Sequence, residues 1–135
     1  MKNLFLLMLG GVLLSCSSAT KKSQLEDNVR NYFLSLRRSD SPAVVSFVHP
    51  KKKEEFLEKS LKLDSVHISL TEVETIFPNE DLSQAIVSAR LEFFSPDQMG
   101  LHSVKRKFSW VFHPEAKTWL LDETGPFGSS FQSSD

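Results

Sequence analysis

The chain has 135 residues, of which 40% are hydrophobic and 24% charged, and its formal net charge is -1 at pH 7. This length suits one domain with its own core, and the near balance of 16 basic and 17 acidic side chains argues against nucleic acid as a partner. The single cysteine, Cys16, excludes an intramolecular disulfide, so the fold must rely on its hydrophobic core.

The N-terminal segment has the parts of an export signal. Lys2 supplies a positive charge, residues 4–14 are apolar apart from two glycines, and the small Ser15 precedes Cys16. A run of this length cannot span a bilayer, which requires about 20 residues. The pattern therefore predicts a targeting segment and not a membrane-spanning helix.

The run Leu13-Leu14-Ser15-Cys16 resembles the lipobox of bacterial lipoprotein precursors, in which the cysteine becomes the new N-terminus. Leu14 departs from the family pattern, which usually has a smaller or β-branched residue there. The resemblance implies a signal peptide over residues 1–15, a diacylglycerol on the Cys16 thiol and, commonly, an acylated amine. Ser17 resembles the proteobacterial class sorted to the outer membrane, because Asp at that position usually retains the protein in the inner membrane.

Two other interpretations of this segment are an ordinary secretory signal followed by a free thiol and a buried helix of a cytoplasmic domain. The first lacks the small-x-small site that such cleavage prefers, and the second lacks a polar side. We therefore expect a protein anchored in the cell envelope through Cys16, on the periplasmic face of the outer membrane if the source is Gram-negative.

The chain after the signal divides into a tether, a domain and a tail. Residues 16–22 are mostly small or polar and predict a short lipidated tether. Residues 23–123 carry helical and strand patterns and predict one α+β globular domain. Residues 124–135 are rich in glycine and serine without periodicity, which predicts a flexible tail in which Phe127 is the residue able to fold back on the core.

Three helices are expected in the first half of the domain. The capping box Ser23-Gln24-Leu25-Glu26 and apolar residues at helical spacing predict a helix over about 24–38. Asp40-Ser41-Pro42 predicts a second helix start, and His49-Pro50 ends that helix. The third expected helix spans roughly residues 52–62. It is expected to bury three side chains, namely Phe56, Leu57 and Leu61.

The hydrophobic period changes to two after residue 65, which predicts strands. In the first strand the apolar residues move from even-numbered to odd-numbered positions, so a bulge is expected near Thr71 and Glu72. A short fourth strand is expected over residues 118–122. The inward residues of the first three strands are expected to be Val66, Ile68, Leu70, Val73 and Phe77, then Ala85, Val87, Ala89, Leu91 and Phe93, then Val104, Phe108, Trp110 and Phe112.

Short turns at residues 78–81, 96–100 and 114–117 imply an antiparallel meander. Helices first and strands after give an α+β fold, with the N-terminal helices packed on a curved antiparallel sheet of about four strands.

This order of elements, with the closing hairpin Trp110-Val111-Phe112 to Trp119-Leu120-Leu121, resembles the cystatin-like or nuclear-transport-factor-2-like superfamily over about residues 23–123. Members range from isomerases and dehydratases to domains without catalysis, so the resemblance does not select a function. The outer-membrane-assembly lipoprotein fold, two helices on three strands, is disfavoured because its glycine-rich helix-start signature is absent.

No constellation of residues identifies a reaction or a cofactor, and the histidines lack metal-ligand spacing. His67 and Glu92 are out of phase with the inward rows, so both are expected to face solvent or pair across strands, Glu92 with Lys105 or Lys107. Arg106 shares the parity of the inward row of its strand. It is the candidate ligand-binding residue for an anion in the concave face, unless its side chain turns to solvent at the strand end.

Two basic clusters stand out, Lys51-Lys52-Lys53 and Lys105-Arg106-Lys107. Lysines that open a helix oppose its macrodipole, so local structure does not explain the first cluster. Either the lysines form a solvated face, or Lys51, Lys52, Lys53, Lys105 and Lys107 form a patch that meets anionic headgroups or cell-wall polymer.

The sequence thus predicts a lipid-anchored envelope protein with a noncatalytic binding or scaffolding role and no cofactor. Its expected partners are the membrane, through Cys16, and another envelope protein or a cell-wall polymer. The alternative is a small-ligand-binding protein or enzyme that uses the concave face of the sheet. An enzyme predicts a deep pocket with a buried carboxylate or histidine there, whereas a scaffold predicts a cone filled by Phe108, Trp110 and Phe112.

Overall fold

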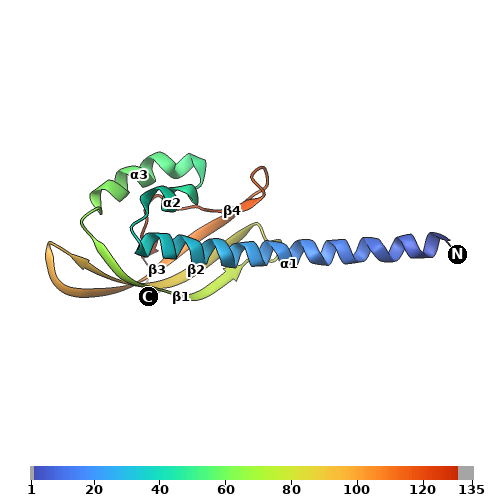
Figure 1. The fold of residues 1–135 in the computed structure, drawn as a ribbon, viewed down its shortest axis with the longest axis horizontal. Coiled ribbons are helices and arrows are strands. Elements are labelled where there is room, and N and C mark those ends of the chain that lie inside the picture. The colour runs from blue at the N-terminus through green and yellow to red at the C-terminus, as the bar shows by residue number, and fades with distance from the viewer. Residues whose placement is uncertain (1, 131–135) are drawn as a thin grey trace, which may run out of the picture.

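The computed structural model describes the backbone of residues 2–130 and the side chains of residues 18–129. The first helix, α1, spans Lys2–Arg37 (Figure 1). The helix start expected at Ser23 is therefore wrong, and residues 18–22, expected to be a flexible tether, are helical. Neither glycine nor proline occurs between Val12 and Asp40, so nothing in the sequence interrupts the helix before the capping box.

The second helix, α2 (Ser41–Ser46), begins where the sequence predicts. The Asp40 side chain accepts a hydrogen bond from the Ala43 amide at 3.3 Å, and Pro42 occupies the first turn. A short 3-10 helix, η1 (Pro50–Lys52), then leads into α3 (Lys53–Lys62).

The helix α3 buries less than its sequence predicts. Phe56 is fully buried, but Leu57 is 45% and Leu61 77% exposed, so the expectation for these two leucines is wrong. The backbone of α3 approaches α2 and η1 and no strand, so the sheet covers little of its apolar stripe. Its exposed leucines lie beside a cavity described below.

The sheet is the expected antiparallel meander, in the order β1-β2-β3-β4. Its strands are β1 (His67–Pro78), β2 (Gln84–Ser95), β3 (Gln98–His113) and β4 (Thr118–Leu121). Helices followed by this sheet confirm the α+β fold class. A fifth strand, β5 (Ser129–Ser130), pairs with β3 and comes from the segment expected to be a tail.

The irregularities of β1 differ from the single bulge expected near Thr71 and Glu72. The register with β2 shifts between Ile68 and Leu70 and again between Val73 and Thr75. Each shift exchanges the two faces of the strand. Phe77, expected to point inward, is therefore 66% exposed and lies opposite the exposed Ile86 on the outer face.

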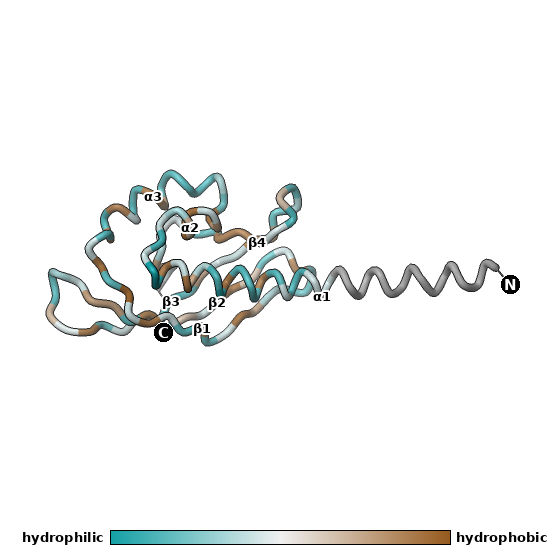
Figure 2. Tube along the Cα trace, in the orientation of Figure 1, coloured by the Kyte–Doolittle hydropathy of each residue, from teal (hydrophilic) through white to brown (hydrophobic). Residues whose placement is uncertain are grey.

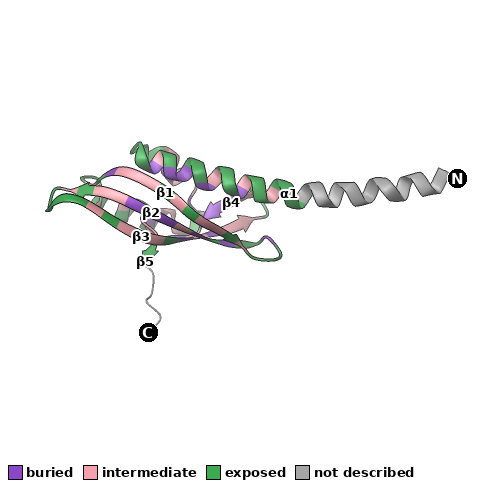
Figure 3. Cartoon of the chain, turned by 90° about the horizontal axis from the view of Figure 1, so that it is seen from below, coloured by how far each residue is buried: buried purple, intermediate pink, exposed green. Residues whose placement is uncertain are grey.

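The core lies between the helices and one face of the sheet, where the inward rows of β2 and β3 are confirmed (Figure 3). The inward side chains from Ala85 to Leu91 are at most 2% exposed, and Phe108 and Trp110 are fully buried. Aromatic rings fill the centre of this face with edge-on contacts at centroid distances from 4.9 to 6.4 Å. These rings belong to Tyr32, Phe33, Phe47, Phe108 and Trp110.

Contacts across the domain fix β4 on both of its edges. One edge pairs with β3, and on the other the His49 amide donates to the Leu121 carbonyl while the Leu121 amide donates to the Phe47 carbonyl. The indole of Trp119 donates to the Lys21 carbonyl of α1 at 2.9 Å. The two ends of the domain sequence are therefore joined through β4.

Residues 122–130, which we call the strap, follow β4 back over the domain. Glu123 and Pro126 are buried, and the Phe127 ring stacks on Phe93 with centroids 6.0 Å apart. The flexible tail expected from residue 124 is therefore wrong as far as residue 130, while the expected return of Phe127 to the core is confirmed. The periodicity of the sequence could not predict this, because the strap is held by single contacts and not by a repeating face.

Candidate functional site

Cys16 is the lipidation site that the sequence predicts. Its side chain lies outside the residues whose side chains the structure describes. Lipidation at Cys16 stays a prediction.

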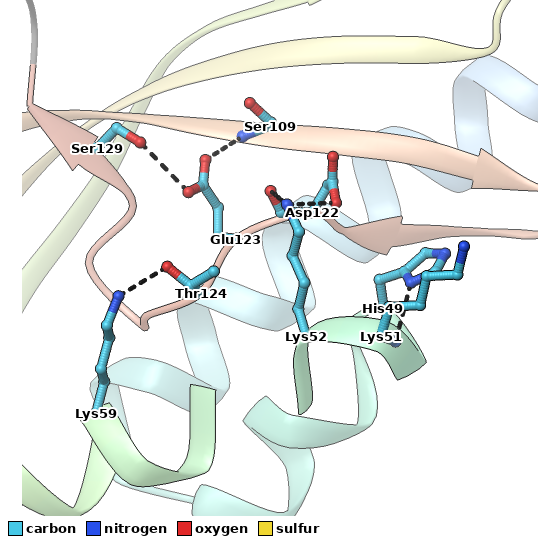
Figure 4. A network of polar contacts seen from close by, with 9 residues as sticks. All are labelled: His49, Lys51, Lys52, Lys59, Ser109, Asp122, Glu123, Thr124 and Ser129. Atoms are coloured by element: carbon cyan, nitrogen blue, oxygen red, sulfur yellow. Dashed lines mark hydrogen bonds and ion pairs between the residues drawn. The ribbon is translucent and has the colours of Figure 1, made fainter. Parts of the chain in front are cut away.

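The first basic cluster does not form a uniform charged patch. Lys51 is exposed and Lys53 half-buried, whereas the Lys52 ammonium forms an ion pair with the Asp122 carboxylate at 2.8 Å and donates to the Asp122 carbonyl at 3.2 Å (Figure 4). Lys52 thus connects η1 to the start of the strap. Glu54 and Glu55 in the first turn of α3 offset the unfavourable lysine charges near the helix N-terminus.

The second basic cluster lies in the middle of β3, and its side chains alternate between the two faces of the sheet. Lys105 and Lys107 are exposed, and the Lys105 ammonium lies 3.5 Å from the Glu74 carboxylate. The expected pairing of Glu92 with either lysine is wrong. Glu92 lies opposite Ser103, and its nearest cation is Arg90 at 3.7 Å.

Arg106 lies in the inward row of β3, as its parity predicts, between Val104 and Phe108. The side chain is half-buried, and its Nε is buried without a hydrogen-bond partner in the described residues. The Nε2 of His102, one inward position beyond Val104, is also buried without a partner. Arg106 therefore keeps an unused donor on the helix-covered face, although aromatic side chains fill the centre of that face.

A polar network holds the strap against β3 (Figure 4). The Glu123 carboxylate, which is 9% exposed, accepts from the Ser109 amide at 2.8 Å and from the Ser129 hydroxyl at 3.3 Å. Lys59 of α3 donates to the Thr124 hydroxyl at 2.9 Å. The buried carboxylate thus accepts hydrogen bonds from a β3 backbone amide and from a hydroxyl of the strap.

Tyr32 of α1 binds the strap from the interior of the domain. Its ring is fully buried, and its hydroxyl donates to the Pro126 carbonyl at 2.7 Å. Burial raises the pKa of the Tyr32 phenol well above its ordinary value of 10.0, and the negative charge of Glu123 raises that pKa further. The neutral phenol is therefore the form that the fold requires.

This requirement predicts a measurable pH dependence. Tyr32 is the only tyrosine, so the ultraviolet absorbance of tyrosinate reports this side chain alone. Since the pKa is raised in the folded state, the unfolded chain loses the proton first. The resulting stability is fully present below the ordinary pKa of about 10 and is lost as the pH rises toward the folded pKa.

We expect tyrosinate absorbance to appear together with the loss of near-ultraviolet circular dichroism in one alkaline unfolding transition. The chain in concentrated denaturant serves as the control and should titrate near the ordinary value. Phenolate that formed near pH 10 with the circular dichroism intact would contradict the buried hydrogen bond to Pro126.

An apolar cavity of about 140 Å³ lies between α3 and the start of β1. Helices α1 and α2, residues 63–68 and the strap complete its walls, with Val44, Ile68 and Phe127 among the apolar lining residues. The polar lining includes Ser60 and Asp64. The cavity exists because α3 lies away from the sheet, and its size and apolar walls suit one apolar group.

The histidines do not assemble a metal site in the described part of the chain. The rings of His49 and His113 lie 5.4 Å apart, but each Nδ1 accepts a backbone amide, from Lys51 and Ala116 respectively. Among residues with described side chains, no three His, Cys, Asp or Glu residues could hold a metal ion. Over the same residues, no helix has the length and apolarity needed to cross a membrane.

Sequence reasoning missed the cavity and the strap network. The helical periodicity of α3 is the same whether Leu61 is buried or exposed, because periodicity does not show which element covers the apolar face of a helix. For Glu123 the only available signal was an acidic residue directly after a buried strand. An acidic residue at that place is also compatible with a solvated strand end.

The chain matches no protein-family model, no curated protein and no solved structure. The candidate sites therefore depend on the residues themselves. They are Cys16 as the site of modification and the cavity beside α3 as the site of apolar contact.

Proposed function

We propose that the chain is a lipid-anchored protein of the cell envelope whose α+β domain has a noncatalytic binding or scaffolding role. The observation that carries the proposal is the position of Cys16, directly after a small residue and an apolar run that follows Lys2. The proposed location is the cell envelope, on the periplasmic face of the outer membrane if the source is Gram-negative. The proposed family likeness, cystatin-like or nuclear-transport-factor-2-like, rests on the order of helices and strands.

The interior of the domain supports a noncatalytic role over an enzyme. The centre of the helix-covered face is filled by Tyr32, Phe108 and Trp110, all fully buried. The buried carboxylate of Glu123 accepts the Ser109 amide and the Ser129 hydroxyl. A general acid or base needs access to a substrate proton, and Glu123 is engaged in holding the strap.

The course of α1 supports a role close to the membrane surface. Residues 18–37 continue as one helix into the domain, and the Lys21 carbonyl is fixed by Trp119. With about 1.5 Å of rise per residue, Lys21 lies less than about 10 Å along the helix from residue 16. A lipid at Cys16 would therefore hold the domain near the headgroups, where exposed lysines such as Lys22 and Lys51 would meet anionic lipid or polymer.

Replacing Cys16 by alanine should remove the lipid anchor, while the uncleaved apolar segment over residues 4–14 stays on the chain. Each buried methylene of an acyl chain contributes about 0.8 kcal/mol, so more than one chain makes membrane binding effectively permanent. We would measure the intact mass of the membrane-extracted full chain and of Cys16→Ala. The expected mass is that of the chain from Cys16 plus acyl chains, and the variant should lack both the acyl mass and the cleavage.

Ser17→Ala is the matched control, because it changes the adjacent residue and leaves the proposed acceptor intact. It should keep the acyl mass and the membrane fraction. Native protein in which Cys16 carries no lipid would sink the anchor proposal.

A further inference from the structure

One end of the domain exposes apolar side chains on the turn between β2 and β3. In this hairpin tip, residues 94–101, Phe94 is 45%, Leu101 52% and Met99 fully exposed. Figures 1 and 3 show the tip extending beyond the helices, with its surface exposed. A free methionine side chain at a hairpin tip gains nothing from its own fold and is suited to insertion into another surface.

The apolar cavity beside α3 opens at the same end of the domain. Its lining includes Val66 and Ile68, which flank His67, and His67 lies opposite Phe94, the first residue of the hairpin tip. The exposed leucines of α3, Leu57 and Leu61, also line the cavity. Figure 2 shows hydrophobic segments in both α3 and the β2–β3 hairpin. A projecting apolar group and an apolar cavity therefore lie close together on one chain.

The two features match in size. The cavity of about 140 Å³ is close to the engineered cavity of about 150 Å³ that binds one benzene molecule. It therefore accepts one large apolar side chain and not a folded element. Methionine is unbranched and flexible, so Met99 can follow an irregular opening that a rigid ring would not fit.

One pair of residues near the two features carries opposite charges. Lys62 directly follows the cavity-lining Leu61 in the sequence, and Asp97 lies in the hairpin tip two residues before Met99. Both side chains are exposed, and within the described residues neither forms an ion pair. Asp64 adds an acidic group to the cavity rim. An incoming tip would bring Asp97 to Lys62 only if it approached from the α3 side.

We propose that this end of the domain is a self-association surface, in which Met99 of one copy inserts into the cavity beside α3 of a second copy. The occupant is a second copy because one chain supplies both the insertion and the cavity, and such a surface is self-complementary under two-fold symmetry. The inference does not depend on lipidation of Cys16.

The first test uses the protein as cells produce it, purified in mild detergent whether or not Cys16 carries a lipid, in sedimentation experiments over a range of concentrations. We expect a dimer whose dissociation constant rises about tenfold or more in Met99→Glu and in Leu61→Glu. Asp97→Lys should weaken the dimer by a few fold, and adding Lys62→Asp to it should restore much of the loss. Phe77→Glu is the matched control, since Phe77 is 66% exposed on the outer face away from the tip, and should not change the dimer.

A disulfide test identifies the contact directly. Chains with Met99→Cys and chains with Leu61→Cys, carrying different tags, would be produced together and oxidised mildly. We expect a disulfide between the two kinds of chain, above the background of the parent chain with Cys16 alone. All the variants change exposed residues, and circular dichroism would verify that they fold.

A chain that sediments as a monomer at its highest soluble concentration would overturn the proposal. So would an association that both Met99→Glu and Leu61→Glu leave unchanged, or the absence of the disulfide between the two kinds of chain. A native protein that forms the dimer but carries no lipid on Cys16 would refute the anchor proposal and leave the self-association proposal standing.

Discussion

Replacing Trp119 by alanine is expected to lower the free energy of unfolding by about 3–5 kcal/mol. The indole is fully buried, its ring lies edge-on to Phe112 with centroids 5.6 Å apart, and its Nε1 donates to the Lys21 carbonyl at 2.9 Å. Alanine would leave a cavity and remove a hydrogen bond that joins α1 to β4. Asn28, which donates to the Trp119 carbonyl and the Thr118 hydroxyl, would still join α1 to β4.

Denaturant unfolding followed by circular dichroism would measure this loss. Trp119→Phe keeps most of the buried ring but removes the donor to Lys21, so it should cost less than the alanine variant. Ile86→Ala removes an apolar side chain that is 43% exposed on the outer face and should cost less than about 1 kcal/mol. A Trp119→Ala loss no larger than that of Ile86→Ala would refute the role of Trp119 in joining α1 to the sheet.

Placing a methyl group at Gly128 should detach the strap. Gly128 has a φ of +61°, and a Cβ there would overlap the Lys107 carbonyl oxygen and lie 2.9 Å from Cδ1 of Phe108. The carbonyl belongs to β3 backbone and cannot move away without disturbing the sheet. We therefore expect Gly128→Ala to lift β5 from β3 and to increase hydrogen exchange at the Ser109 amide, which Glu123 protects.

Gly100 provides the matched control for this substitution. It also has a positive φ, of +90°, but a Cβ there meets nothing within 4 Å. Gly100→Ala should therefore show only the backbone strain, about 1–2 kcal/mol. Gly128→Ala should exceed that cost by about 1 kcal/mol or more, because the overlap adds to the strain. Equal costs for the two variants would mean that the strap is not held tightly at Gly128.

The features that the sequence predicted correctly depend on a short local motif or on a regular hydrophobic periodicity. The Asp40 cap of α2 and the alternating rows of β2 and β3 depend on neighbouring residues and on one buried face. The features that it predicted wrongly depend on residues far away in the chain. Leu61 is exposed because α3 lies off the sheet, and Phe77 points outward because β1 has two register shifts.

The candidate sites divide in the same way. The inward position of Arg106 on β3 followed from the alternation of its strand, whereas lipidation at Cys16, predicted from four consecutive residues, stays a prediction. The cavity and the contact between Tyr32 and Pro126 were not found, because each joins segments that carry no shared pattern. The run of three lysines likewise did not predict that Lys52 forms an ion pair with Asp122.

The hydrogen bonds from Trp119 to Lys21 and from Tyr32 to Pro126 join residues 98 and 94 positions apart. The N-terminal helix and the last part of the domain thus depend on each other, so these two contacts cannot form until residues 119–126 have left the ribosome. Contacts of such long sequence separation form slowly. The contacts that fix β4 and the strap are therefore the last ones that the emerging domain can complete.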